Sequence, residues 1–111
     1  MMFNKVYSAP TLSILIKYYL INEIDVKYSG SKYLDRDIYK HCFELVYNGA
    51  TLYNVDLLIV STKAYISLGV PNVSKEEREI ELFSLDEQNQ DRLIVNTLIS
   101  LCNDLNVRIF K

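Results

Sequence analysis

The only histidine of the chain lies between two acidic residues at spacings that could form a metal site. Asp37 precedes His41 by four positions and Glu44 follows it by three. On a helix these spacings place the three side chains on one face, where they could share a metal ion. However, the sequence has no second histidine, and Cys42 and Cys102 are not spaced as a ligand pair. We therefore interpret the three residues as a solvated helix face and expect no metal and no cofactor.

A second set of polar residues lies at an apolar run in the middle of the chain. Asp56 is inside that run, Val55–Val60, where a carboxylate is costly unless it is paired or binds a ligand. The run is followed directly by three polar residues, Ser61, Thr62 and Lys63. Ligands of open α/β sheets bind at the carboxyl ends of strands, although the glycines of a phosphate-binding loop are missing here. Two interpretations stay open: a ligand site made of Asp56 and these three residues, or a simple turn after a strand in which Asp56 is exposed or, if buried, pairs with Lys63 or Arg108.

The clearest charge feature is an acidic segment between residues 74 and 92. It contains seven acidic residues against three basic ones, whereas the whole chain has a formal net charge of -2. The sequence has no long basic patch that could neutralise phosphates, which disfavours nucleic-acid binding. This acidic segment is either a solvated face or a surface that binds a protein with a basic surface. In the second case, exposed tyrosines would add contact area. The predicted protein-binding residues are Glu76, Glu77, Glu79, Glu81, Tyr39 and Tyr47.

Hydrophobic periodicity predicts alternating strands and helices. The run Val55–Val60 is typical of a strand buried on both faces at the centre of a sheet. The elements predicted before it are a strand at Phe3–Ala9, a helix after Pro10, a strand at Ile24–Tyr28 that ends at Ser29-Gly30-Ser31, and a helix from Asp35 or Asp37 to Asn48 that Gly49 terminates. The elements predicted after it are a hairpin strand at Ala64–Leu68 (a short helix is the alternative), a helical turn at 74–77 before a strand at Glu79–Phe83, a helix from Ser84 or Asp91 to Asn106, and a strand at Val107–Phe110.

These elements predict one globular domain over residues 1–111 of the α/β class, with an α+β arrangement as the alternative. We expect a sandwich with a mixed central sheet of about five strands, flanked by three helices that cover both faces. The apolar stretch Leu12–Ile21 is too short to span a membrane, and no signal-peptide cleavage site follows it. We therefore expect a cytoplasmic protein with no membrane partner, in which both cysteines are buried and reduced.

Part of this pattern is similar to the restriction-endonuclease-like domains that end some prokaryotic ATPases. Between Phe43 and Val95, under half of the chain, both have a helix, a strand that begins with Val-Asp, a Tyr-Ile strand and a Glu-Arg-Glu stretch. The resemblance implies that Asp56 matches the first acid of a metal-dependent cleavage centre. In that family the next strand adds a second acid and a lysine, whereas Tyr65–Gly69 contains neither. The resemblance therefore implies a non-catalytic relative.

Nucleophilic catalysis is not indicated either, because nothing places a serine beside His41 and Cys42 points to another part of the predicted helix. We therefore predict no catalytic residues and favour a non-enzymatic protein-interaction module. Its most economical form is a small inhibitor or immunity-type protein, of bacterial, phage or viral origin, that binds another protein with a basic surface. The competing hypothesis is a nuclease-like or nucleotide-binding domain that uses the loop after the central strand. A third is a homodimer, formed through a sheet edge or through the stripe Tyr39, Phe43 and Tyr47.

Overall fold

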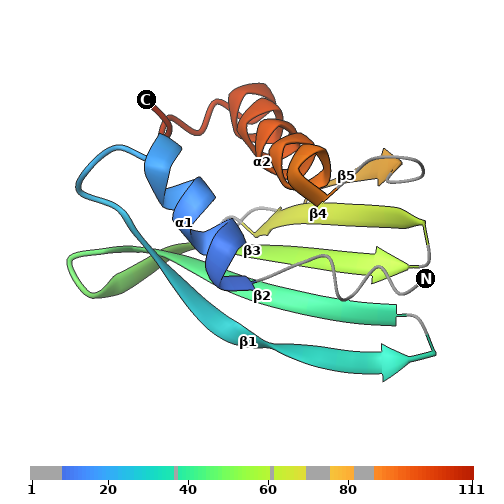
Figure 1. The fold of residues 1–111 in the computed structure, drawn as a ribbon. Coiled ribbons are helices and arrows are strands. Elements are labelled where there is room, and N and C mark those ends of the chain that lie inside the picture. Colours follow the sequence, from blue (N-terminus) through green and yellow to red (C-terminus); the bar gives the residue numbers. More distant parts are fainter. Residues whose placement is uncertain (1–8, 37, 61, 70–75, 82–86) are drawn as a thin grey trace.

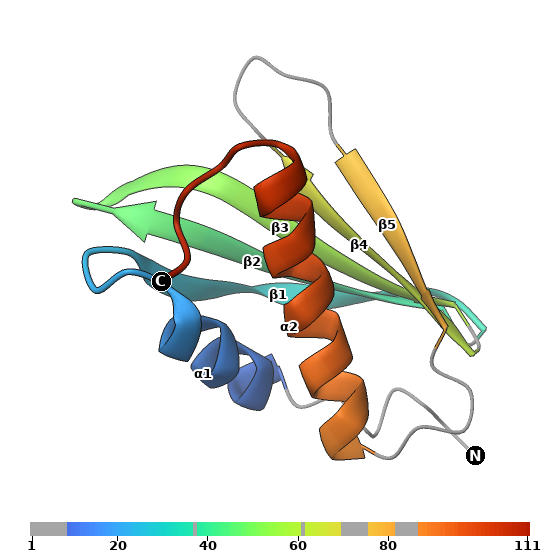
Figure 2. The same cartoon turned by 90° about the horizontal axis from the view of Figure 1, so that it is seen from above.

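Five strands and two helices make up the computed structural model, which describes residues 9–36, 38–60, 62–69, 76–81 and 87–111. The strands form one antiparallel sheet in the order β1-β2-β3-β4-β5, so that β1 and β5 are its edges. Both helices lie on the same face of the sheet (Figures 1 and 2). The class is therefore α+β. The elements are α1 Ala9–Tyr19, β1 Asp25–Asp35, β2 Ile38–Tyr47, β3 Ala50–Val60, β4 Lys63–Gly69, β5 Glu76–Glu81 and α2 Glu87–Asp104.

The face of the sheet beneath the helices, called the inner face below, carries the hydrophobic core. Side chains alternate between the two faces of a strand, and the inner ones between Val55 and Ile59 of β3 are at most 1 % exposed. They belong to one buried cluster with the apolar rows of both helices. Burial of each large apolar side chain contributes about 1.5–3 kcal/mol, so this shared core fixes the helices on the sheet. The central members are Val55, Leu57 and Ile59 of β3, Leu12, Ile16 and Leu20 in and after α1, and Ile94, Leu98 and Leu101 of α2.

The opposite face of the sheet, the outer face, has no described helix over it. There Asp56, Leu58 and Val60 of β3 are half-buried. The predicted central strand is confirmed, since β3 is the third of the five strands. The prediction that both of its faces are buried is wrong, because an antiparallel sheet with its helices on one side leaves the other side to solvent.

The helix predicted up to Asn48 is wrong, because these residues form strand β2. Phe43 and Leu45 are buried on the inner face, whereas Cys42 is half-buried on the outer face rather than fully buried as predicted. Asn48 and Gly49 do not end a helix. Their φ angles of 52° and 78° make the turn of the β2–β3 hairpin. An Asn-Gly pair suits this turn because both central residues of a type I′ turn need positive φ.

Several other predicted elements are confirmed. The helix after Pro10, the hairpin strand β4, the strand around Glu79 and the last helix are all present, and Asn106 follows the last helix with a φ of 59°. Strand β1 is longer than predicted. It continues through Gly30, where the strand was expected to end, because a bulge with a φ of 129° is accommodated there by glycine.

The end of the chain and the layer arrangement differ from the prediction. Val107–Phe110 is not a strand of the sheet: Phe110 forms a single bridge with Leu20, and the amide of Lys111 donates to the carbonyl of Tyr19 at 2.8 Å. These bonds tie the end of the chain to the end of α1. The sheet is antiparallel rather than mixed, and the two described helices cover one face rather than both. Glu76 and Glu77, predicted in a helical turn, belong to strand β5 instead. The predicted strand Phe3–Ala9 and the segments 74–75 and 82–86 lie outside the described residues, apart from Ala9, which begins α1.

Candidate protein-binding site

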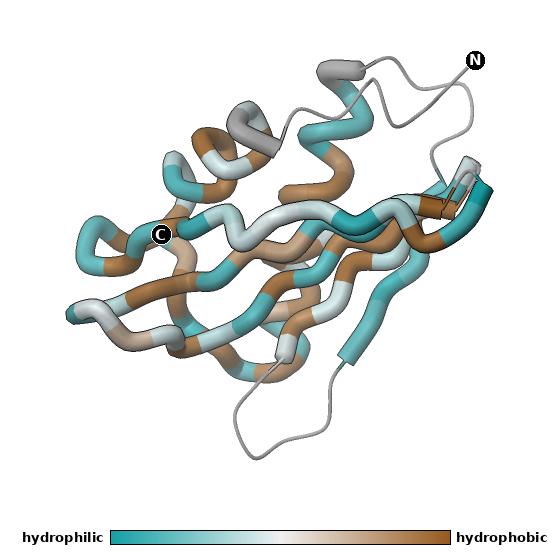
Figure 3. Tube along the Cα trace, turned by 90° about the horizontal axis from the view of Figure 1, so that it is seen from below, coloured by the Kyte–Doolittle hydropathy of each residue, from teal (hydrophilic) through white to brown (hydrophobic). Residues whose placement is uncertain are grey.

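The edge strand β5 carries a row of three glutamates. Because successive side chains alternate along a strand, Glu77, Glu79 and Glu81 share the outer face, about 7 Å from one to the next. All three are exposed. Among the described strands β5 pairs with β4 alone, and Figure 3 shows it as a largely hydrophilic strand at the margin of the sheet. We call these three glutamates the acidic row.

The middle of the acidic row is paired with the neighbouring strand. Lys63 Nζ lies 3.2 Å from Glu79 Oε2. The hydrogen bond and the charge of Glu79, with a smaller effect from Glu81, raise the pKa of Lys63, which therefore remains a cation beside the row. One lysine against three glutamates leaves the row with a negative charge.

The fourth predicted acidic contact, Glu76, lies on the other side of β5. Arg78 Nη1 is 3.9 Å from Glu76 Oε2, and Arg78 Nη2 is 3.2 Å from Asp104 Oδ2 at the end of α2. Glu76 is thus part of a network that joins β5 to α2 and does not belong to the acidic row. The structure brings together three of the four predicted glutamates.

The two predicted tyrosine contacts lie away from the acidic row. Both are in β2, which β3 and β4 separate from β5. Tyr39 is half-buried, and its ring centroid lies 5.0 Å from that of Tyr33 in β1. Tyr47 is exposed next to the β2–β3 turn. Phe43, which would complete an aromatic stripe between them, is buried in the core and cannot contribute to an open surface.

Asp56 is paired within the sheet. It lies on the outer face between Cys42 of β2 and Ser67 of β4, and Lys40 Nζ is 3.8 Å from its Oδ2. The partner is thus neither Lys63 nor Arg108, because Lys40 lies on the same face of the adjacent strand. Burial, followed by the neighbouring Asp56 carboxylate, raises the pKa of the Cys42 thiol. The thiol therefore stays protonated, which makes it a poor nucleophile.

The other residues of the predicted ligand site are not close to Asp56. Thr62 and Lys63 follow the end of β3, and the four residues of extended chain from Asp56 to Val60 span about 13 Å. Lys63 is paired with Glu79, and Ser61 lies outside the described residues. The structure therefore does not bring Asp56 and Lys63 into one site. The helix with which the similarity to endonuclease domains begins is also absent, because Phe43 lies in strand β2.

His41 and Glu44 lie on opposite faces of β2, so the solvated helix face predicted for them does not exist. His41 is 8 % exposed on the inner face, with Tyr28 Oη 3.3 Å from its Nδ1 and no hydrogen-bond partner for its Nε2 within the described residues. Burial lowers its pKa, which favours the neutral ring. Glu44 accepts hydrogen bonds from the hydroxyls of Ser29 and Thr51. In the described part of the chain, no three His, Cys, Asp or Glu side chains are grouped to hold a metal ion.

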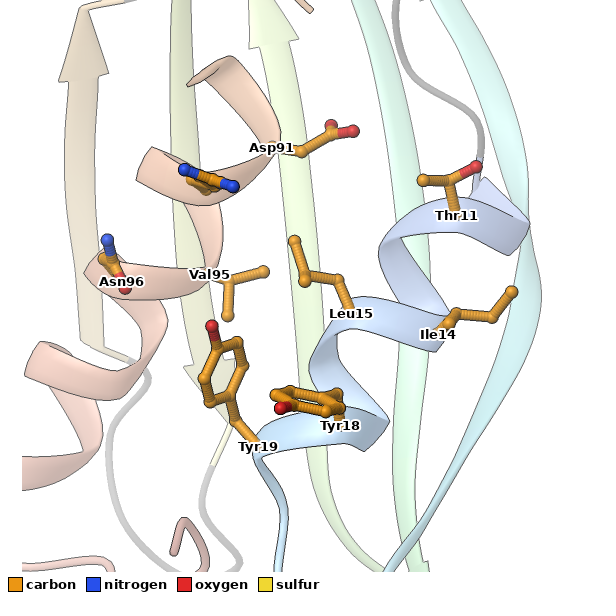
Figure 4. A pocket seen from close by; sticks show the side chains of 9 residues that line it. Thr11, Ile14, Leu15, Tyr18, Tyr19, Asp91, Val95 and Asn96 are labelled. Atoms are coloured by element: carbon orange, nitrogen blue, oxygen red, sulfur yellow. The ribbon is translucent and has the colours of Figure 1, made fainter. Parts of the chain in front are cut away.

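A groove that the sequence analysis missed lies between α1 and α2 (Figure 4). It has a volume of about 630 Å³. Leu15 of α1 and Val95 of α2 approach each other across it, with Tyr18 and Tyr19 at one end and Asp91 at the other. The sequence held one signal for this surface: α1 is apolar on nearly every side, which is unusual for a helix that covers a sheet with one face only.

The acidic row and the groove are two open features of the described structure. Neither described helix combines the length and the hydropathy that are needed to cross a membrane. A scan against protein-family models, a search of curated proteins and a search of solved structures each returned no match to this chain.

Proposed function

We propose that this chain is a non-enzymatic protein-binding domain that docks an extended, basic segment of another protein along β5. A small inhibitor or immunity-type protein is the simplest biological form of such a domain. The observation that carries the proposal is the acidic row, three exposed glutamates on one face of a strand at the edge of the sheet.

The binding mode follows from the geometry of an edge strand. A strand that pairs on one side has main-chain N–H and C=O groups on its other side, and an extended peptide can bond to them as a sixth strand of the sheet. Side chains of the added strand alternate with the same period as those of β5. Lysines or arginines at every second position would therefore stand opposite Glu77, Glu79 and Glu81.

The two parts of this contact have different roles. Main-chain hydrogen bonds hold the added strand, whereas exposed ion pairs are individually weak. The acidic row instead speeds the encounter with a basic partner and fixes which face of the added strand lies beside it. Because screening by salt weakens such steering, the affinity is expected to fall as the ionic strength rises.

The same charges oppose pairing of β5 with β5 of another copy. Two acidic rows on adjacent strands would face like charges across the strand pair, which destabilises it. Charged side chains are also a common means by which natural proteins protect an open sheet edge from aggregation. The acidic row therefore disfavours pairing between two copies of β5 and favours pairing with a basic segment of another protein.

The test is binding of a short peptide with lysine at alternate positions and threonine or valine between them, measured at low salt. The double variant Glu77→Lys/Glu81→Lys reverses the ends of the acidic row and leaves the Lys63–Glu79 pair in place. We expect it to bind the peptide on the order of 100-fold more weakly, since like charges placed in contact cost several kcal/mol. A peptide with glutamate in place of lysine is expected not to bind the wild type.

The matched control is Glu23→Lys/Asp35→Lys, which changes the net charge equally but lies outside β5. We expect it to bind within about threefold of the wild type, apart from a general charge effect that salt removes. Equal losses in both double variants would mean that only net charge matters and would refute docking at β5. A capture experiment from lysate with the same three proteins would then identify the natural partner, as a protein that is retained by the wild type and the control and lost by the β5 variant.

A further inference from the structure

Helix α1 exposes apolar side chains on the side that faces away from the sheet. Ile14 is 72 % exposed, Tyr18 69 % and Tyr19 40 %, although Leu12 and Ile16 of the same helix are fully buried in the core. A helix that is apolar all round is normally covered on all sides. Its exposed side is therefore an apolar part of the described surface that a partner could cover.

The exposed side of α1 combines a protruding side chain with a groove of suitable size. Tyr18 lies at one end of the groove between α1 and α2, whose floor is formed by Leu15 and Val95 (Figure 4). The rim is polar and includes Arg92 and Asn96 of α2. An apolar centre within a polar rim is the usual composition of a protein interface. Because protrusion and groove are adjacent on one surface, that surface can be complementary to itself, as a two-fold interface requires.

The charge of α1 does not oppose such self-association, and the charged residues of the groove, Asp91 and Arg92, lie on α2 and have opposite signs. Lys17 is the only charged residue of α1, and it is held inside its own copy: its Nζ lies 2.9 Å from Asp25 Oδ1 and donates to the carbonyl of Ile24 at 2.6 Å. The side chains that protrude from α1, Ile14 and Tyr18, are neutral. Two copies can therefore approach through α1 without the like-charge repulsion that two acidic rows would meet.

We infer that two copies of this chain associate about a two-fold axis through α1, with Tyr18 of each copy inserted into the α1–α2 groove of the other. The exposed parts of Ile14, Tyr18 and Tyr19 amount to on the order of 400 Å² per copy. Two copies thus bury on the order of 800 Å² through these side chains, and the rim brings the total closer to the lower limit of about 1,200 Å² for stable interfaces. The dimer is therefore weak and concentration-dependent. The proposed dimer leaves β5 accessible, because the acidic row lies on the outer face of the sheet and α1 on the inner face. Each dimer therefore presents two acidic rows.

The test is sedimentation equilibrium from about 5 to about 500 µM, a range chosen for a weak interface. The wild type is expected to change from monomer to dimer within this range. Tyr18→Ala removes the protrusion and is expected to weaken association on the order of thirtyfold, the effect of a central aromatic contact. Leu34→Ala, at a position of β1 that is 53 % exposed, is the matched control and is expected to change association less than about twofold.

A second variant tests the groove separately from the protrusion. Asn96→Glu places a longer, charged side chain at the rim, and Asn103→Glu makes the same change two turns further along α2, outside the groove. Asn96→Glu is expected to weaken association and Asn103→Glu is not. Since Tyr18→Ala keeps the floor and the α2 rim of its groove, and Asn96→Glu keeps its tyrosine, a mixture of the two retains one of the two insertions. The mixture is therefore expected to associate more strongly than either variant alone.

Each of three results would overturn the inference. The wild type could remain monomeric up to the highest concentration, or Tyr18→Ala and Leu34→Ala could weaken association equally. The mixture could also associate no better than its components, which would exclude reciprocal insertion. Circular dichroism of each variant verifies that it is folded, which is expected because all four substituted positions are exposed.

Discussion

The acidic row on β5 and the exposed side of α1 are both uncovered surfaces, but their chemistry is opposite. The row is three carboxylates on an edge strand, whereas α1 presents neutral isoleucine and tyrosine side chains beside a groove. Like charges disfavour contact of the row with its own copy, whereas the exposed side chains of α1 carry no charge that would do so. In the two proposals above, charge therefore assigns one surface to a foreign partner and another to self-association within a chain of 111 residues.

The largest effect is expected from reversing the acidic row. Glu77→Lys/Glu81→Lys should lose on the order of 100-fold in affinity for the basic peptide, while its dimer dissociation constant stays within about twofold of the wild type. Peptide titration and sedimentation of the same preparation measure both quantities. A parallel loss of both functions would show that the two surfaces are coupled or that the variant has changed the fold.

The converse variant is Tyr18→Ala. It should weaken self-association on the order of thirtyfold and leave the affinity of a single acidic row for the basic peptide unchanged. The peptide must be monovalent in this measurement, since a bivalent probe would lose avidity together with the dimer. A drop in monovalent affinity would mean that peptide docking depends on the α1 surface, against the proposed separation.

Salt should distinguish the two surfaces without any substitution. Raising the ionic strength from about 0.05 to about 0.5 M shortens the screening length from roughly 14 to roughly 4 Å. We expect the affinity for the basic peptide to fall on the order of tenfold, while the apolar dimer weakens less than about twofold or strengthens. Two affinities with the same salt dependence would remove the chemical contrast between the surfaces.

The smallest expected effect is a change of folding stability with pH, which comes from His41 in the core beneath both surfaces. Burial lowers the pKa of His41 in the folded protein below the ordinary value of 6.5. Below about pH 6.5 the unfolded chain takes up this proton more readily than the folded one, so stability is lost as the pH falls from there towards the folded-state pKa. Above about pH 6.5 His41 is neutral in both the folded and the unfolded state, so it does not change the pH dependence of stability there.

Thermal melting of the wild type and of His41→Gln between pH 8 and 5 checks this linkage. Glutamine cannot be protonated in this range, so its melting temperature should fall less on acidification than that of the wild type. Parallel pH profiles for the two proteins would contradict a buried, neutral His41. Because other carboxylates also titrate towards pH 5, the difference between the two profiles is the relevant quantity.

The sequence predicts β3 and α2 correctly because each has a pattern that only one period explains. Val55–Val60 is a short, mostly apolar run rich in β-branched residues, and Ile94, Leu98 and Leu101 repeat at helical spacing. β2 is predicted as a helix because Asp35 or Asp37 could cap it and Gly49 could end it, and because Ile38, Cys42 and Val46, like Tyr39, Phe43 and Tyr47, are four residues apart. This spacing fits one face of a helix and, being an even number, also fits one face of a strand.

The candidate site was predictable in part. The acidic row was found from charge, and the alternation of Glu79 and Glu81 with Ile80 already indicated a strand. Two features were not predictable from the charge pattern. Glu76 points towards Arg78 because of the side on which the alternation of β5 places it, and β5 is an edge strand because of the sheet topology. The α1–α2 groove depends on how two distant helices pack on the sheet, and only the unusual all-round apolarity of α1 signalled it.

The most direct test of docking at β5 is the position of the bound peptide on the protein. In a titration of the isotope-labelled chain with the alternating-lysine peptide, backbone amide shifts report which strand is contacted. The proposed mode predicts that the largest changes occur along Glu76–Glu81 and that amides of β5 become slower to exchange with solvent. Changes centred on the α1–α2 groove or on β1 instead, with β5 unaffected, would contradict it.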